Sequence, residues 1–187
     1  MKVHVRKITR LPEYDYSGEG AYYVTICTKN KACILGDIKE GQMKLTPIGE
    51  IAQEQIQNTP HIRGNVAIDS FVIMPNHIHM ILVITGNDGR DMARHVPTGR
   101  HRFGKPQSGT LSTIVGAIKS AITRNINIRG IGPGGSIWQG RFFEHIIRNE
   151  KALDKIREYI YNNPRNWQDD DENPNRIKYD LISRSAQ

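Results

Sequence analysis

The sequence predicts a single α+β domain in which an antiparallel sheet packs against helices. Its 187 residues are enough for one domain with a substantial core and too few for two. Runs rich in β-branched and aromatic residues are separated by short turns, which favours antiparallel pairing of neighbouring strands. Other stretches carry apolar residues at helical spacing. We expect one domain over residues 1–187, with a basic flexible loop over about 86–109 and an irregular tail over about 168–187.

Strands account for the first part of the domain. Residues 21–28 are dense in β-branched and aromatic residues and follow a polar loop, which is typical of a strand. Residues 29–31 predict a turn, and residues 39–42 predict another between the short runs 32–36 and 43–45. This pattern predicts an antiparallel hairpin or meander.

A helix follows, with a recognisable beginning. Thr46 stands at an N-cap position, Pro47 at the first helical position and Glu50 in the first turn. The helix is expected to end near Asn58, because helical spacing continues up to there, at Ile48, Ile51, Ala52, Gln55 and Ile56.

Two histidines interrupt the apolar pattern of the next pair of strands. Residues 66–74 and 77–84 predict strands that are joined by a two-residue turn and pair antiparallel. His77 and His79 lie two residues apart, so their side chains point to the same face, with Cα atoms roughly 6.5 Å apart. Two such imidazoles can bind one metal ion, although a hydrogen-bonded pair in the core would give the same pattern.

Residues 86–109 form a long segment with no apolar periodicity. The segment holds five Lys and Arg residues against two Asp. Two interpretations stay open: a solvated insertion, or a basic arm that binds nucleic acid through Arg100, Arg102 and Lys105.

A second helix is predicted over residues 110–127. Its apolar residues share one stripe, at Leu111, Ile114, Val115, Ile118, Ile122 and Ile126. Residues 130–135 match the dinucleotide pattern G-x-G-x-x-G, but they neither follow a strand nor open a helix. We therefore interpret them as a loop only.

The last strand is predicted within residues 137–149, after a bend at Gly140. Its aromatic residues, Phe142 and Phe143, could belong to the core or form a platform for base stacking, and we expect core. His145 could approach a site or simply pack. Arg141 and Arg148 are further candidates for binding nucleic acid.

The last helix, over about residues 150–163, presents a second group of functional candidates. Tyr159 and Asn163 are four residues apart and fall together along one edge of its apolar stripe, whereas Tyr161 points away. A phenol with a pKa near 10 is a poor nucleophile unless a metal polarises its target or a base assists. Two imidazoles and an amide oxygen, from His77, His79 and Asn163, would suit Mg²⁺ or Mn²⁺ and leave positions open for phosphate oxygens.

These residues resemble a known family. His77-Ile78-His79 is similar to the His-hydrophobic-His signature of the HUH endonuclease superfamily. The helix motif resembles that of the REP-associated tyrosine transposases, which are related to single-tyrosine insertion-sequence transposases. Further similar blocks occur in the same order at Asp15-Tyr16-Ser17, Tyr23-Val24-Thr25, Trp138-Gln139, residues 141–149, residues 159–164 and Trp167.

The resemblance implies a ferredoxin-like or RRM-like antiparallel sheet with helices, the HUH endonuclease fold, with the histidine pair on a central strand. It implies that Tyr159 attacks a phosphate of single-stranded DNA at REP-type hairpins and forms a 5′-phosphotyrosine link. It also implies a Mg²⁺ or Mn²⁺ cofactor bound by His77, His79 and Asn163. The insertion-sequence relatives have Gln where Asn163 stands; because Asn is shorter, either the helix lies closer to the strand or a water bridges the amide to the metal.

Composition agrees with a nucleic-acid partner. Lys and Arg number 26 against 19 Asp and Glu, which gives a net charge of +7 and favours polyanions. Cys27 and Cys33 lack the spacing of a metal site and are expected to be reduced thiols. No apolar run approaches the ~20 residues that span a bilayer, so we expect a cytoplasmic protein. A DNA partner further leads us to expect association with the bacterial nucleoid, and both a monomer and a homodimer stay open.

Two other functions remain open at this level. One is a hairpin-binding module of the same fold without catalysis, and the other is a hydrolytic phosphoesterase that uses the histidines without a covalent tyrosine. The acidic run at residues 169–172 is expected to be solvated.

Overall fold

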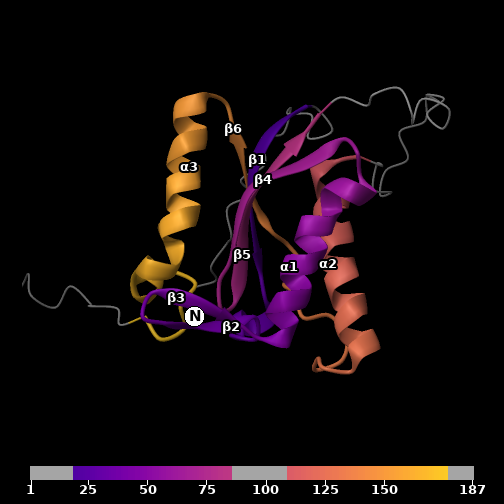
Figure 1. Ribbon diagram of the computed structural model, residues 1–187, viewed down its shortest axis with the longest axis vertical. Coiled ribbons are helices and arrows are strands. Elements are labelled where there is room, and N and C mark those ends of the chain that lie inside the picture. Colours follow the sequence, from indigo (N-terminus) through magenta and orange to yellow (C-terminus); the bar gives the residue numbers. More distant parts are fainter. Residues whose placement is uncertain (1–18, 86–108, 177–187) are drawn as a thin grey trace, which may run out of the picture.

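The computed structural model of this chain describes residues 19–85 and 109–176. A four-stranded antiparallel sheet with strand order β4-β5-β1-β6 is its centre (Figure 1). The strands are β1 (Gly20–Cys27), β4 (Val66–Ile73), β5 (His77–Ile84) and β6 (Phe143–Ile147). The α+β prediction is confirmed, and the histidine strand β5 lies inside the sheet, between β1 and β4.

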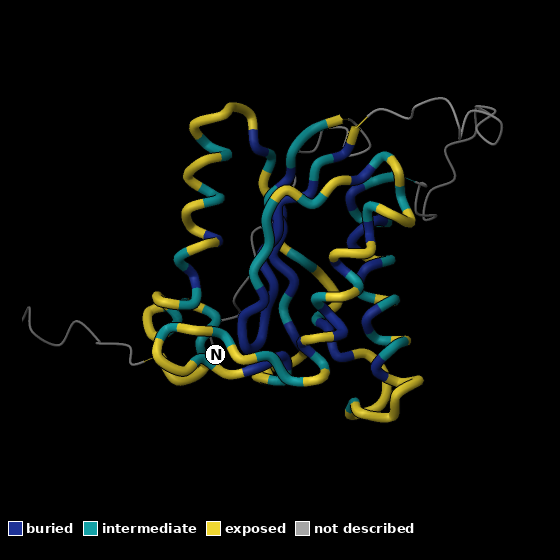
Figure 2. Tube along the Cα trace, in the orientation of Figure 1, coloured by how far each residue is buried: buried dark blue, intermediate teal, exposed yellow. Residues whose placement is uncertain are grey.

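Helices cover both faces of this sheet. Helices α1 (Pro47–Ile62) and α2 (Leu111–Arg129) lie on one face, and α3 (Glu150–Asn162) lies on the other (Figure 1). Strand β5 is the most buried of the described elements (Figure 2).

Strand alternation sorts side chains between the two faces. On the α1 and α2 side, Tyr22, Val24 and Ile26 of β1 join the main core with Ile78 and Met80 of β5. A smaller core on the α3 side is formed by Ile81, Ile147 and Ile160, with Tyr23 packed against it. Because His77 and His79 have the same parity as Ile81, they face α3.

Side-chain caps explain where the helices begin. Thr46 accepts a hydrogen bond from the backbone N–H of Gly49, and Asn149 accepts one from that of Ala152. Helix α1 runs to Ile62, beyond the expected end near Asn58. Pro60 has no backbone N–H to donate, but the helix continues past it, because the backbone N–H of Arg63 still donates to the carbonyl oxygen of Thr59.

Helix α2 also continues past its expected end. It begins after Thr110, which accepts a hydrogen bond from the backbone N–H of Thr113. It ends at Arg129 rather than Asn127, where Gly130 takes the left-handed conformation with φ of 65°.

A separate hairpin stands beside the sheet. Strands β2 (Gly36–Lys39) and β3 (Gln42–Leu45) pair antiparallel, and Glu40 and Gly41 both take positive φ in the turn. An antiparallel hairpin is therefore present, as a two-stranded sheet of its own, but its first strand lies at residues 36–39 and not at the predicted residues 32–36. Short 3-10 helices η1 (Lys29–Lys31) and η2 (Asn163–Asp169) complete the described elements.

Three further expectations concern the basic loop, the cysteines and membrane-spanning helices. Arg100, Arg102 and Lys105 of the basic loop lie outside the described residues. Cys27 and Cys33 are free thiols, as expected. Within the described ranges, none of the helices is both long and apolar enough to cross a membrane.

Candidate active site

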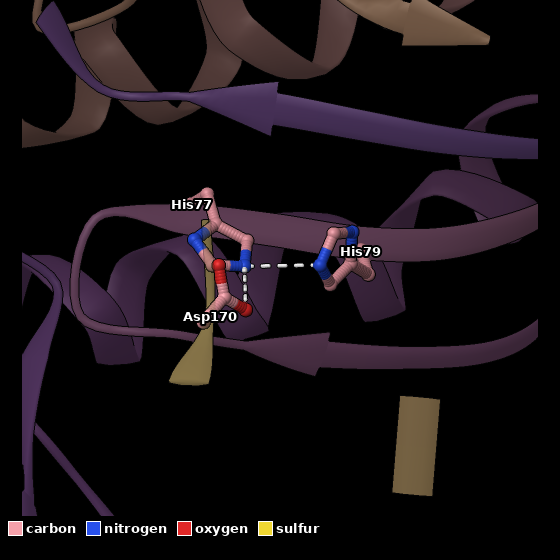
Figure 3. Close-up of side chains that lie close together, drawn as sticks. All are labelled: His77, His79 and Asp170. Carbon is pink, nitrogen blue, oxygen red and sulfur yellow. Dashed lines mark hydrogen bonds and ion pairs between the residues drawn. The ribbon is translucent and has the colours of Figure 1, made fainter. Parts of the chain in front are cut away.

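The two histidines open β5 and converge on each other. Their Nε2 atoms are 3.0 Å apart, and both residues are buried, with 0% and 5% of their surface exposed (Figure 3). Pairing of β5 with β1 places His77 opposite Cys27 and His79 opposite Thr25. The expected placement of both imidazoles on one sheet face is therefore found.

Asn76 determines the orientation of His77. The Asn76 side-chain N–H groups donate to the backbone carbonyls of Lys31, at 3.1 Å, and Glu172, at 2.8 Å. Its Oδ1 therefore faces Nδ1 of His77, at 2.8 Å. An amide oxygen can only accept, so Nδ1 carries the hydrogen and Nε2 of His77 presents its lone pair to the site.

Two hydroxyl groups meet the far side of the His79 ring. Nδ1 of His79 lies 2.7 Å from the Tyr23 hydroxyl and 2.8 Å from that of Thr25. Two lone pairs cannot face each other at 3.0 Å, so His79 donates from Nε2 to His77 in this structure. Because a hydroxyl can donate or accept, Tyr23 and Thr25 support either tautomer of His79, including the one whose Nε2 is free to bind a metal.

Burial keeps both imidazoles neutral. It lowers the pKa of His77 and of His79 well below the usual 6.5, and for His77 the neighbouring His79 and Lys31 act in the same direction. Neutral imidazole is the form that binds metals.

Asp170 is the third member of the cluster. Its Oδ2 lies 3.8 Å from Nε2 of His77, and the ligand atoms of His77, His79 and Asp170 all lie within 4.8 Å of one another (Figure 3). Burial raises the pKa of Asp170, although a hydrogen bond from the backbone N–H of Glu172 opposes the rise.

The prediction of a solvated acidic run is wrong for Asp170, whose side chain is 9% exposed. Helix η2 returns the chain to the sheet immediately after α3 and brings this carboxylate to the histidines. The neighbouring Asp171 does match the prediction, with 91% of its side chain exposed. The short distance in sequence from Asn163 could have indicated that an acidic residue of this run lies near the site. The sequence of four adjacent acidic residues does not reveal which one turns inward.

Tyr159 and Asn163 reach the same place from α3 and η2. The Tyr159 hydroxyl lies 3.5 Å from Nε2 of His79, and its ring meets the His79 ring at a centroid distance of 5.4 Å. Tyr159, Asn163, His79 and Asp170 line one pocket of about 440 Å³. Tyr161 is 73% exposed, on another side of the helix, as its helical phase predicts.

Asn163 carries an unsatisfied atom. The residue is 2% exposed, and its Oδ1 has no hydrogen-bond partner among the described residues. A buried carbonyl oxygen without a donor is costly, and a bound cation would remove that cost. The donor set of two neutral imidazoles, a carboxylate and an amide oxygen therefore fits a divalent metal ion.

Tyr159 is protonated at neutral pH. Burial raises the pKa of its phenol and Asp170 adds to the rise, while a hydrogen bond with Asn163 opposes it. A reaction through Tyr159 therefore has to remove this proton as the nucleophile attacks.

Phe143 is not the core residue that the sequence predicts. It is 45% exposed and lines the same pocket as Tyr159, whereas Phe142 packs against the main core as expected. Alternation along the edge strand β6 sends Phe143 to the face that α3 leaves partly open. His145 lies on this face opposite Tyr23 but does not line the pocket, and Arg141 and Arg148 are exposed.

Comparison with known proteins gives a consistent result. No family model matches the chain. A Haemophilus influenzae protein of uncharacterized function is 39% identical over 176 residues, which cover 90% of this chain and 93% of the relative. Another protein of that organism, which carries the provisional name of a REP-associated tyrosine transposase, is 30% identical over 160 residues, covering 80% of this chain and 73% of the relative.

A solved structure shares the fold. It is that of a REP-associated tyrosine transposase bound to a REP hairpin, with a TM-score of 0.56 and 22% identity, covering 84% of this chain and 74% of the other. Its likeness supports the expected α+β fold, and the sequence identity to the named relative decides the family. This chain belongs to the family of REP-associated tyrosine transposases.

Proposed function

We propose that this protein cleaves and rejoins single-stranded DNA at REP-type hairpins, as a metal-dependent endonuclease and strand transferase that uses Tyr159 as its nucleophile. The observation that carries the proposal is the convergence of Tyr159 with the buried histidine pair in one pocket. Family membership supports the class of reaction, and the hairpin bound in the related structure supports the class of substrate.

A divalent cation, Mg²⁺ or Mn²⁺, would be held by His77, His79 and Asp170, with Asn163 as a further oxygen ligand. When bound, it supplies a Lewis acid that draws charge from the scissile phosphate. Asp170 extends the three-residue site that the sequence predicts.

The protein's own residues account for the covalent step. The Tyr159 oxygen attacks phosphorus, and the bond from phosphorus to the 3′ oxygen of the preceding nucleotide breaks. The products are a 5′-phosphotyrosine and a 3′-hydroxyl, which takes up a proton. The phenol proton can pass to water, because Tyr159 is 48% exposed. One phosphodiester replaces another, so the reverse reaction rejoins DNA without ATP.

The test is detection of the covalent adduct. A labelled REP-type hairpin oligonucleotide with unpaired tails is incubated with the protein and Mn²⁺ or Mg²⁺ and analysed on a denaturing gel. We expect a protein–DNA band that EDTA prevents. Tight binding of the hairpin, insensitive to EDTA and without cleavage, would contradict the proposal and support a binding module.

Direct metal binding by Asp170 can be distinguished from a general effect of the negative charge of residues 169–172. Asp170→Asn is expected to weaken Mn²⁺ binding by about tenfold or more, because it removes a buried charged ligand, and calorimetric titration measures this. The matched control is Asp171→Asn, one residue away and 91% exposed, which should bind Mn²⁺ as the wild type does. Equal effects of the two changes would show that Asp170 acts only through long-range charge.

The two hydroxyls beside His79 are expected to be redundant. Tyr23→Phe or Thr25→Val alone leaves one hydroxyl within hydrogen-bond distance of Nδ1, so Mn²⁺ affinity should change little. The double variant leaves Nδ1 without a partner and should lose about 10- to 100-fold in affinity. A double-mutant cycle by calorimetry measures this, and additive single effects would contradict redundancy.

A further inference from the structure

We propose that Phe143 is a stacking platform for an unpaired base of the DNA strand that lies beside Tyr159. The inference rests on the proposed function and deepens it, because it assigns a residue that recognises the single-stranded part of the substrate. Phe143 is one of a few large hydrophobic residues that the described chain exposes, and it opens onto the pocket of Tyr159.

Tyr23 sets the distance between the platform and the nucleophile. Its ring meets Phe143 edge-on at a centroid distance of 6.2 Å, and meets Tyr159 edge-on at the same distance. No described residue stacks a parallel ring on Phe143. The Phe143 ring is therefore held in place one ring away from Tyr159, while much of its surface stays open to a ligand.

Charge distinguishes the two walls of the pocket. The wall formed by the end of η2 and the residues after it carries four acidic residues, Asp169, Asp170, Asp171 and Glu172. The wall formed by β1 and β6 offers Thr25, Cys27 and Phe143, with no carboxylate. A DNA strand carries a negative charge at every phosphate, so apart from the scissile phosphate it is favoured along the β6 wall.

The neighbours of Phe143 suit a nucleic-acid strand. Arg141 precedes it by two residues and His145 follows it by two, and both are exposed. An aromatic ring flanked by cationic or polar groups is the usual arrangement for binding single strands, because every base can stack on a ring whatever its sequence. Tyr161, although more exposed, does not line this pocket.

The test compares two DNA probes on a background that cannot cleave. In the Tyr159→Phe protein, the probes are the hairpin oligonucleotide with unpaired tails and the same hairpin without tails. Phe143→Ala is expected to weaken binding of the tailed probe by between about fivefold and a hundredfold, and to leave the tailless probe unchanged. Phe143→Trp should restore binding, while Phe143→Leu, which keeps apolar bulk and protects the fold, should not. Tyr161→Ala is the matched control and should bind both probes normally.

A spectroscopic signal reports stacking directly. 2-Aminopurine placed at successive tail positions should be quenched at one of them on binding, and Phe143→Leu should abolish that quenching. Equal weakening of both probes, or quenching that persists without the ring, would overturn the inference. Because these measurements need no cleavage, they test the stacking inference separately from the proposed function. The proposed function is contradicted if the wild type forms no adduct.

Discussion

Tyr159→Phe is expected to abolish the covalent protein–DNA adduct while hairpin binding persists. The change removes only the phenol oxygen, which lies 3.5 Å from Nε2 of His79, and keeps the ring that packs against Tyr23. The Phe side chain offers no nucleophile in its place. We expect adduct formation, measured on a denaturing gel, to fall by at least about a thousandfold, since the variant lacks the oxygen that forms the bond to phosphorus.

The matched control is Tyr161→Phe. Tyr161 is on the same helix and is also an exposed tyrosine, but its position in the helical turn directs it away from the histidines. Its variant should form the adduct at the wild-type rate. An adduct that survives Tyr159→Phe and disappears with Tyr161→Phe would reverse the assignment. Cleavage that survives Tyr159→Phe without any adduct would indicate a hydrolytic phosphoesterase.

The periodic parts of this site were predictable from the sequence. Alternation along a strand puts His77 and His79 on one face, and the helical repeat puts Tyr159 and Asn163 on one edge of a helix. Each of these inferences depends only on local geometry. Bringing the two pairs together across about eighty residues depended on the resemblance to a family, because local periodicity says nothing about which strand a helix will cover.

The parts that failed depend on tertiary structure. Asp170 is largely covered because η2, which contains Pro164, turns the chain back, and a short 3-10 helix has too few residues to show a period. Phe143 is exposed because β6 is an edge strand that α3 covers only in part, whereas composition favours a buried aromatic. Both errors concern residues that line the same pocket.

His77→Ala and His79→Ala are expected to abolish both the adduct and the stabilisation of the protein by Mn²⁺. A cation at one hundred times its Kd adds about 2.7 kcal/mol to the free energy of unfolding. For a protein of this size that corresponds to a rise in Tm of roughly 5–10 °C. Either variant removes one of the two imidazoles whose Nε2 atoms meet at 3.0 Å, so calorimetry should find little or no rise.

The comparison has to be made within each variant, with and without the cation, because removing a buried histidine also lowers stability directly. His77→Ala leaves the Oδ1 of Asn76 without the N–H that it accepts from, and His79→Ala leaves the hydroxyls of Tyr23 and Thr25 without the ring nitrogen, Nδ1, to which they hydrogen-bond. The matched control is His61→Ala, an exposed histidine at the end of α1, which should keep the full Mn²⁺ effect. A full Tm rise in either buried variant would mean that the cation binds elsewhere, and the loss of the adduct would then have to come from the imidazoles themselves.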